Sequence, residues 1–587
     1  MQDFKRLLHY LGPYRKDLIA GALLVLVETF FELLIPVLMA DLIDTGVAAR
    51  DIPYILHKGI QMGVCALLSL ATGLLYARFA ARAAYGWGAR IREAQYERIQ
   101  SYAFSNLDHF ETASLVTRMT TDVTVLQNAI NAGLRPLVRS PVMLIMGLGL
   151  SFWMNARLAM VFVVCAPVLG LILFFVVRRV APMYGRLQKA VDRLNNVVQE
   201  SLTAIRAVKA FVRGAYEEAK FQEVNTVLMD TSQRTFHYAV LNLPAFQLTM
   251  YTAVVLIMWF GGNMILQANL QVGELTGFLS YVLQVMNSMM MISNVFLLLT
   301  RSLASAHRIS EVLEEKVSLA SPNRPVTQVP DGRVDFEGVS FQYDTSAEEY
   351  ALVDVTLHLP AGSTIGILGG TGSAKTTLVQ LIPRLYDVTK GVVKVGGRDV
   401  REYDLQALRD AVGIVLQKNV LFSGTVRENL LWGNPQADDE TLWAACRAAC
   451  ADEFLRQMPK GLDTDLGQGG VNVSGGQKQR LCIARTLLKR PKILIFDDST
   501  SAVDTATEGN IRASLAALRD VTKITIAQRV TSVMEADQII ILEDGRIHAV
   551  GTHGELLASD PIYQEIYESQ MKGGTAHART ANQCEKA

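Results

Sequence analysis

A glycine-rich loop carries residues that could bind a charged ligand. The loop follows an apolar strand, expected over residues 364–368, and precedes a helix. The loop consists of Gly369, Gly370, Thr371, Gly372, Ser373, Ala374, Lys375, Thr376 and Thr377. Backbone N–H groups of such a loop bind phosphates, while its lysine reaches the β- and γ-phosphate oxygens and the adjacent threonine hydroxyl binds Mg²⁺. The loop therefore predicts binding of ATP and Mg²⁺, with Lys375 on the phosphates and Thr376 on the metal.

One loop position departs from this pattern. Ala374 stands where the second glycine is expected. If the position requires a positive φ, the extra methyl group costs on the order of 1 kcal/mol. We expect this cost to weaken the loop without abolishing nucleotide binding.

Two acids follow a second apolar strand about 120 residues later. The run KILIF at 492–496 is expected to be a buried strand, and Asp497 and Asp498 follow it. A carboxylate at this place coordinates Mg²⁺ in phosphate-loop enzymes. The sequence predicts that role for Asp497; the alternative is a turn whose acids bind nothing.

A second phosphate-binding helix start lies between these two motifs. Ser474 is expected to cap the helix, and the residues that follow it are Gly475, Gly476 and Gln477. The two glycines expose backbone N–H groups at the positive end of the helix, where an anion binds favourably.

These motifs, in this order, resemble the ATP-binding cassette family and its signature sequence. The resemblance implies that Tyr343 stacks on adenine and that Gln417 touches Mg²⁺ and relays to the membrane domain. It also implies that the loop at 501–504, which ends in Asp504, crosses a dimer interface.

Two residues nearest the chemistry depart from the family. Asp498 replaces the usual glutamate that polarises the attacking water, and Gln528 replaces the histidine that contacts the γ-phosphate. Loss of a well-placed general base lowers the rate by roughly 10²–10⁴. We expect a heterodimer in which the slow, mainly ATP-holding site is formed by Lys375, Asp497, Asp498 and Gln528, the last two being its catalytic residues. The signature completes a competent site on a second half-transporter chain. A homodimer with two slow sites is the alternative.

The first half of the chain predicts six membrane spans. Leu158–Val177 carries no charge, and about 20 helical residues suffice to cross the hydrocarbon core. Comparable apolar runs lie near 17–40, 57–77, 137–155, 240–265 and 275–300. Basic loops between spans two and three and spans four and five place both termini in the cytosol. With no transit peptide, we expect a multi-pass protein of a bacterial inner membrane.

Two features within the spans have more than one interpretation. Glu28 and Glu32 share one face of the first span, where they contact either a cationic substrate or another helix. The methionines of the sixth span form either an adaptable surface for apolar ligands or ordinary packing; they are Met286, Met289, Met290 and Met291.

The whole sequence predicts an all-α six-helix membrane domain followed by a cytosolic α/β phosphate-loop ATPase domain. We expect these parts at 1–300 and 333–570, joined by a linker at 301–332 and followed by a disordered tail at 571–587. Lys plus Arg and Asp plus Glu both number 56, so net charge gives no reason to expect a nucleic-acid partner.

The resemblance extends to half-size exporters, including multidrug and lipid-flipping members, because Phe110, residues 115–118 with Asp122, and residues 207–211 resemble their cytosolic turns. It implies ATP-driven export of a small or amphipathic solute, with membrane lipid as a further partner. An ATP-gated channel or regulatory subunit, and an importer that uses the exporter fold, stay open as alternatives.

Overall fold

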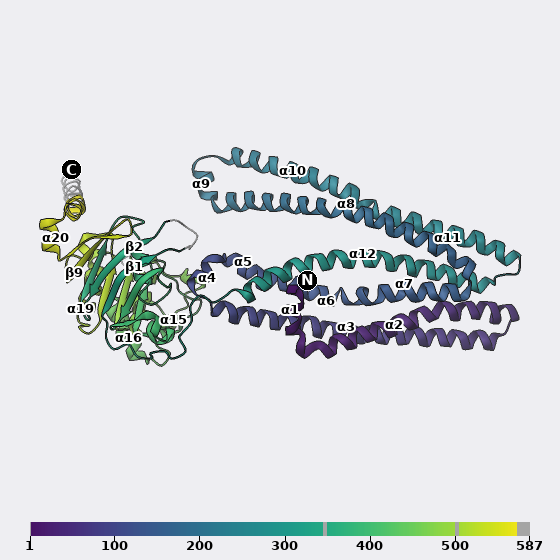
Figure 1. Ribbon diagram of the computed structural model, residues 1–587, viewed down its shortest axis with the longest axis horizontal. Coiled ribbons are helices and arrows are strands. Elements are labelled where there is room, and N and C mark those ends of the chain that lie inside the picture. Colours follow the sequence, from purple (N-terminus) through teal and green to yellow (C-terminus); the bar gives the residue numbers. More distant parts are fainter. Residues whose placement is uncertain (1, 344–348, 499–503, 572–587) are drawn as a thin grey trace. The chain divides into compact units, whose positions relative to one another are not determined.

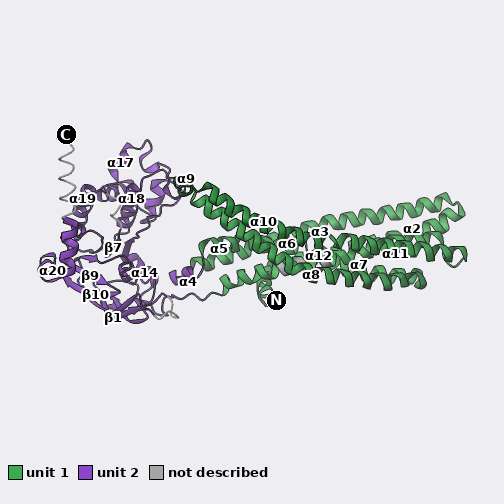
Figure 2. Ribbon diagram, turned by 90° about the horizontal axis from the view of Figure 1, so that it is seen from above, with its two compact units in different colours: residues 1–100, 111–315 green, residues 101–110, 316–587 purple. Residues whose placement is uncertain are grey.

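The computed structural model describes residues 2–343, 349–498 and 504–571. The predicted disordered tail lies outside the described residues from 572 onward. The chain divides into two compact units (Figure 2). Unit 1 consists of Met1–Gln100 and Glu111–Glu315, and unit 2 consists of Ser101–Phe110 and Lys316–Ala587.

Unit 1 is built from long helices, as the charge-poor apolar runs predict. Among the described residues it holds six stretches that are long and apolar enough to cross a membrane. The helices that carry them are α2 (Arg15–Asp41), α3 (Ile52–Gln100), α7 (Leu134–Met154), α8 (Ala156–Thr203), α11 (Asn242–Leu266) and α12 (Val272–Glu314) (Figure 1). The predicted six-helix membrane domain is confirmed.

Several of these helices are much longer than a membrane span. Helix α3 has 49 residues and α8 has 48, so each is about 70 Å long, against a hydrocarbon core of about 30 Å. Helix α8 is followed by the short α9 (Ile205–Ala210) and by α10 (Gly214–Val240), which packs along α8 (Figure 1). These helices therefore extend well beyond the membrane.

The last helix of unit 1 also extends into the predicted linker. Helix α12 continues through Glu314, whereas the linker was expected to begin at residue 301. Ala306 and Ile309 keep a helical spacing and are buried in one apolar cluster with Trp87 and Leu126, so packing maintains the helix. No helix or strand is described between 315 and 333, apart from an isolated bridge at Val326.

The two membrane glutamates are both paired with arginines of a neighbouring helix. Arg135 of α7 donates to Glu28, and Arg139 donates to Glu32 at 2.5 Å. Only 3% of Glu28 is exposed. A carboxylate in this setting requires a partner, and the arginine supplies one. The structure favours the inter-helix interpretation of these glutamates over a contact with a cationic substrate.

Arg135→Gln should destabilise unit 1, because it leaves Glu28 buried without its cation. We expect a loss of roughly 2 kcal/mol, measured as a lower midpoint of thermal unfolding in detergent micelles. Arg139→Gln should have a smaller effect, since the side chain of Glu32 is 31% exposed. The double variant Glu28→Gln/Arg135→Gln should recover much of the lost stability. The same unfolding midpoint for all three variants would contradict a stabilising ion pair between Glu28 and Arg135.

Unit 2 is an α/β domain with two sheets. The larger sheet has six strands in the order β10-β9-β3-β8-β7-β6, and the smaller has the order β2-β1-β4-β5. The strands of the larger sheet are β3 (Thr364–Leu368), β6 (Val412–Val415), β7 (Ile493–Asp497), β8 (Thr522–Ile526), β9 (Gln538–Glu543) and β10 (Arg546–Gly551). Those of the smaller sheet are β1 (Val334–Phe341), β2 (Leu352–Leu359), β4 (Lys390–Val395) and β5 (Arg398–Asp399).

Strand β8 lies between β3 and β7 and pairs with both of them in parallel. All five residues of β7 are buried, which is typical of a parallel strand covered on both faces. Loops that leave the carboxyl ends of parallel strands gather at one edge of the sheet. The glycine-rich loop after β3 and the acids at the end of β7 therefore meet there, and the predicted α/β fold class is confirmed.

Candidate nucleotide site

A cavity of about 950 Å³ lies at this edge of the larger sheet. Most of the predicted site residues line it: Tyr343, Gly369, Gly370, Thr371, Gly372, Ala374, Lys375, Thr376, Thr377, Gln417, Asp497, Asp498 and Gln528. Ser373, which belongs to the same loop, is buried and donates a hydrogen bond from its hydroxyl to the carbonyl of Gly370 at 2.9 Å. The fold thus brings together residues from five separate segments of the sequence.

The glycine-rich loop has the backbone geometry of a phosphate-binding turn. A Cβ atom at Gly369 would lie 2.2 Å from the carbonyl oxygen of Leu542, so only glycine fits there. The ammonium of Lys375 donates to the carbonyls of Gly369 and Gly370 at 2.9 and 2.6 Å. Burial lowers the pKa of Lys375. An anionic phosphate in the loop would oppose this shift, because it stabilises the charged ammonium.

Ala374 adopts a left-handed conformation, with φ of 68° and ψ of 25°. This backbone meets the condition stated from the sequence, under which the alanine methyl group carries a steric cost. The residue caps helix α13 (Lys375–Gln380), so the strain lies directly before Lys375.

Ala374→Gly should raise the free energy of unfolding of unit 2 by about 0.5 to 1 kcal/mol, because it removes the methyl group from a left-handed residue. Thermal unfolding of the full chain measures this. Ala444→Gly is the matched control: Ala444 lies inside the right-handed helix α16 (Asp439–Ala448), so glycine should lower stability there. If both variants shifted the unfolding temperature in the same direction, the result would contradict a strained backbone at Ala374.

The oxygen atoms proposed for Mg²⁺ lie close together. The Thr376 hydroxyl donates to Oδ1 of Asp497 at 2.8 Å, and Gln417 lines the same cavity. Burial raises the pKa of Asp497, and a nearby divalent cation would counter this by favouring the carboxylate. Hydroxyl, carboxylate and amide oxygens are hard ligands of the kind Mg²⁺ prefers alongside substrate phosphates. The residues present fit the predicted ion.

The two departures from the family contact one another directly. The Gln528 amide donates through Nε2 to Oδ2 of Asp498 at 2.7 Å. Asp498 itself has a φ of 47°, which is uncommon for a residue other than glycine. Both residues were predicted to be catalytic from the sequence, but this hydrogen bond between them was not predicted.

Gln570, near the end of the described chain, supports the site but was not predicted from the sequence. Its amide donates to the carbonyl of Gln528 at 2.9 Å, and its side-chain oxygen accepts from the N–H of Val530 at 2.8 Å. Gln570 thereby fixes the backbone of the segment that carries Gln528. No local pattern marks a half-buried glutamine 42 residues away as a support for this segment.

Tyr343 borders the cavity as part of an aromatic cluster. Its ring lies edge-on to Phe341 and Tyr386, with centroids 4.8 and 5.3 Å away. Its hydroxyl shares a hydrogen bond of 2.8 Å with Thr377 in the glycine-rich loop. About half of the side chain is exposed, which leaves surface for the adenine that the sequence predicts there.

A short turn from the first half of the sequence also belongs to unit 2. It contains helix α4 (Phe104–His109). Asp108 accepts a hydrogen bond of 2.6 Å from the hydroxyl of Tyr386, and the rings of Phe104 and Tyr386 are 6.0 Å apart. The amide of Asn106 donates to the carbonyl of Lys316 at 2.8 Å. This turn, which ends at the predicted contact residue Phe110, thus packs on the aromatic cluster that borders the cavity.

The signature residues form a capped helix start outside the cavity. Ser474 caps α18 (Gly475–Leu488), accepting from the N–H of Gln477, whose side chain in turn accepts from the N–H of Ser474 at 2.9 Å. Gly475 is exposed and Gly476 is partly exposed. The predicted interface residue Asp504 caps α19 (Thr505–Ala516), while 501–503 lie outside the described residues.

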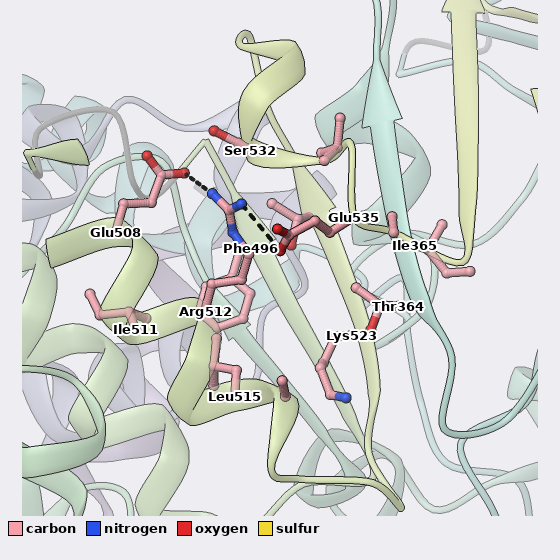
Figure 3. A pocket seen from close by; sticks show the side chains of 14 residues that line it. Thr364, Ile365, Phe496, Glu508, Ile511, Arg512, Leu515, Lys523, Ser532 and Glu535 are labelled. Carbon is pink, nitrogen blue, oxygen red and sulfur yellow. Dashed lines mark ion pairs between the residues drawn. The ribbon is translucent and has the colours of Figure 1, made fainter. Parts of the chain in front are cut away.

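A second, smaller cavity of about 120 Å³ lies beside α19 (Figure 3). Arg512 reaches from α19 to Glu508 and Glu535, each at 3.7 Å (Figure 3). Ser532 and Val533, which follow the Gln528 segment, also line it. Among the described residues it shares no lining residue with the nucleotide cavity. The Arg512–Glu508 ion pair lies within α19, and the Arg512–Glu535 ion pair connects α19 to the chain after β8.

The sequence matches two family descriptions, "ABC transporter transmembrane region" over residues 18–289 and "ABC transporter" over residues 352–501. It is 38% identical to the uncharacterized ABC transporter ATP-binding protein YfiB of Bacillus subtilis, over 97% of this chain and 98% of that protein. This chain belongs to the ABC transporter family. Its nucleotide-binding domain therefore binds ATP and couples ATP hydrolysis to transport.

Two further proteins are similar to this ABC transporter over nearly its whole length. It is 29% identical to the ATP-dependent lipid A-core flippase of Desulfotalea psychrophila, over 96% of this chain and 99% of the flippase. Its fold matches the structure of a bacterial Atm1-family ABC exporter with ATP bound, with a TM-score of 0.79 and 24% identity, covering 95% of this chain and 98% of the exporter. The chain thus shares the fold of that exporter, and its six long apolar helices make it a multi-pass membrane protein.

Proposed function

We propose that this chain is one half of a heterodimeric exporter for a small or amphipathic solute. In this proposal its own nucleotide site holds ATP and hydrolyses it slowly. Its signature helix completes a competent site on the partner chain. The observation that carries the proposal is the hydrogen bond from Gln528 to Asp498.

This hydrogen bond weakens the site in two ways. Asp498 is one methylene shorter than glutamate, and one of its oxygens already accepts from the Gln528 amide, so it is a poorer acceptor for a proton from water. Glutamine also cannot carry the positive charge that a histidine can place near the γ-phosphate. Both changes oppose hydrolysis, whereas the loop that holds the phosphates keeps its lysine.

The signature, by contrast, keeps the features needed to bind an anion. The helix is capped by Ser474, its first two residues are glycines, and the helix start is exposed. A backbone N–H group at a helix N-terminus binds phosphate without help from any charged side chain. A chain with a weakened catalytic pair and a preserved signature is suited to serve a partner's site.

The other assignments of the nucleotide site are part of the same proposal. Lys375 and the backbone of 369–377 hold the phosphates, Tyr343 stacks on adenine, and Thr376, Gln417 and Asp497 hold Mg²⁺. When bound, Mg²⁺ would neutralise charge on the β- and γ-phosphates. Asp504 lies at the dimer interface.

Transport itself would follow from alternating access. ATP favours the state in which two nucleotide-binding domains are close, and the long helices α3, α8 and α12 extend far enough to carry that change into the membrane. Export from a bacterial inner membrane, with both termini cytosolic, is consistent with the exporter relatives. The flippase relative favours an amphipathic solute, without identifying it.

The catalytic pair can be tested in the full chain reconstituted in lipid nanodiscs. The wild-type chain by itself should hydrolyse ATP very slowly, and Asp498→Glu/Gln528→His should raise turnover by roughly tenfold or more, because it restores a free base and a chargeable contact. Phosphate release measures this, and Lys375→Ala added to the double variant is the control for activity from another source. Wild-type turnover of roughly 1 s⁻¹ or faster would contradict a slow site.

The heterodimer can be tested in the complex captured by an affinity tag on this chain. Ser474→Arg should abolish most ATP turnover of the complex, since it blocks the signature that serves the partner's site. Lys375→Ala, which disables this chain's own slow site, should leave a larger share of that turnover. Equal loss in both variants, or capture of this chain alone, would favour the homodimer.

A further inference from the structure

Helices α8 and α10 enclose a strongly basic pocket of about 820 Å³. Arg178, Arg179 and Arg186 reach it from α8, and Arg234 and His237 reach it from α10. We call this group the basic pocket. None of the described residues that line it carries a carboxylate.

Some arginines of unit 1 pair with an acid. Arg118 pairs with Glu311, and Arg308 pairs with Asp122. Within the described ranges, no ion pair joins any arginine of the basic pocket to an acid. Like charges repel one another, so cations that gather without a carboxylate favour an anion between them.

The basic pocket lies where an apolar span ends. Arg178 and Arg179 come directly after the charge-free stretch Leu158–Val177, and His237 lies just before the apolar helix α11. The Arg179 guanidinium lies over the ring of Tyr238, 5.8 Å from its centroid. Arginine and tyrosine together are typical of the boundary between hydrocarbon and lipid headgroups.

Apolar surface continues from the basic pocket toward the membrane. Phe174 and Phe175, one turn before Arg178 on α8, are 57% and 60% exposed. Val240 and Leu241, which follow the pocket residue Tyr238 where α10 meets α11, are also exposed. A ligand with an anionic head and apolar chains would match both parts of this surface.

We propose that the basic pocket binds the phosphate headgroup of an acidic phospholipid from the adjoining leaflet. Guanidinium groups match phosphate oxygens in pairs, and basic pockets between membrane helices recognise such headgroups. Arginines that only set the orientation of the chain in the membrane need only lie in a cytosolic loop. They do not need to converge from two helices, about fifty residues apart in sequence, on one pocket.

The test is native mass spectrometry of the full chain in detergent micelles with added phosphatidylglycerol or phosphatidylcholine. Wild type should retain phosphatidylglycerol in preference to phosphatidylcholine. Arg186→Gln/Arg234→Gln removes one arginine from each helix and should weaken phosphatidylglycerol binding by roughly tenfold. Lys189→Gln/Arg193→Gln removes the same charge from exposed positions of α8 outside the basic pocket and should bind as wild type does.

Three outcomes would overturn the proposal. The first is equal retention of both lipids by wild type, and the second is equal loss of phosphatidylglycerol in both double variants. The third is competition by glycerol 3-phosphate as effective as that of the lipid, which would mean that the pocket takes soluble phosphates. Arg186→Lys/Arg234→Lys keeps the charge but not the paired guanidinium hydrogen bonds, so its binding should lie between that of wild type and that of the glutamine pair, which separates loss of recognition from misfolding.

Discussion

The parallel pairing of β8 with both β3 and β7 is the constraint on which the nucleotide site depends. Each strand leads into a segment that lines the nucleotide cavity. These segments are the glycine-rich loop after β3, the acids at the end of β7, and Gln528 after β8. Because the strands run in one direction, these segments leave the sheet at the same edge. A shift in register of either pair would separate Thr376 from Asp497, or Gln528 from Asp498.

The sequence could predict those parts of the site whose geometry is local. The loop at 369–377 has a motif with a fixed backbone, so the left-handed conformation of Ala374 could be stated as a condition before the structure was known. The acid after a buried strand is also a local pattern. The hydrogen bond between Gln528 and Asp498 depends on the order of strands in the sheet, and the support from Gln570 depends on how the C-terminal segment packs.

In the membrane half, too, the sequence predicts features that are local along the chain but not contacts between distant segments. Apolar runs of sufficient length predicted all six spans, because the lipid core requires continuous apolar helices. The partners of Glu28 and Glu32 lie 107 residues away on α7, and nothing near either glutamate identifies them. The extension of α12 to Glu314 was missed for a similar reason, since Ala306 and Ile309 are stabilised by apolar residues of other helices.

The turn at 101–110 has a consequence for how the chain can be divided. The backbone passes between the two units three times: after Gln100, after Phe110 and after Glu315. A fragment cut at 316 would therefore lose part of the ATPase unit, including Asp108, Asn106 and Phe104. The hydroxyl of Tyr386 would lose its acceptor, and its ring would lose a covering side chain next to Tyr343. The isolated ATPase domain would thus lack contacts to Tyr386 that it has in the intact transporter.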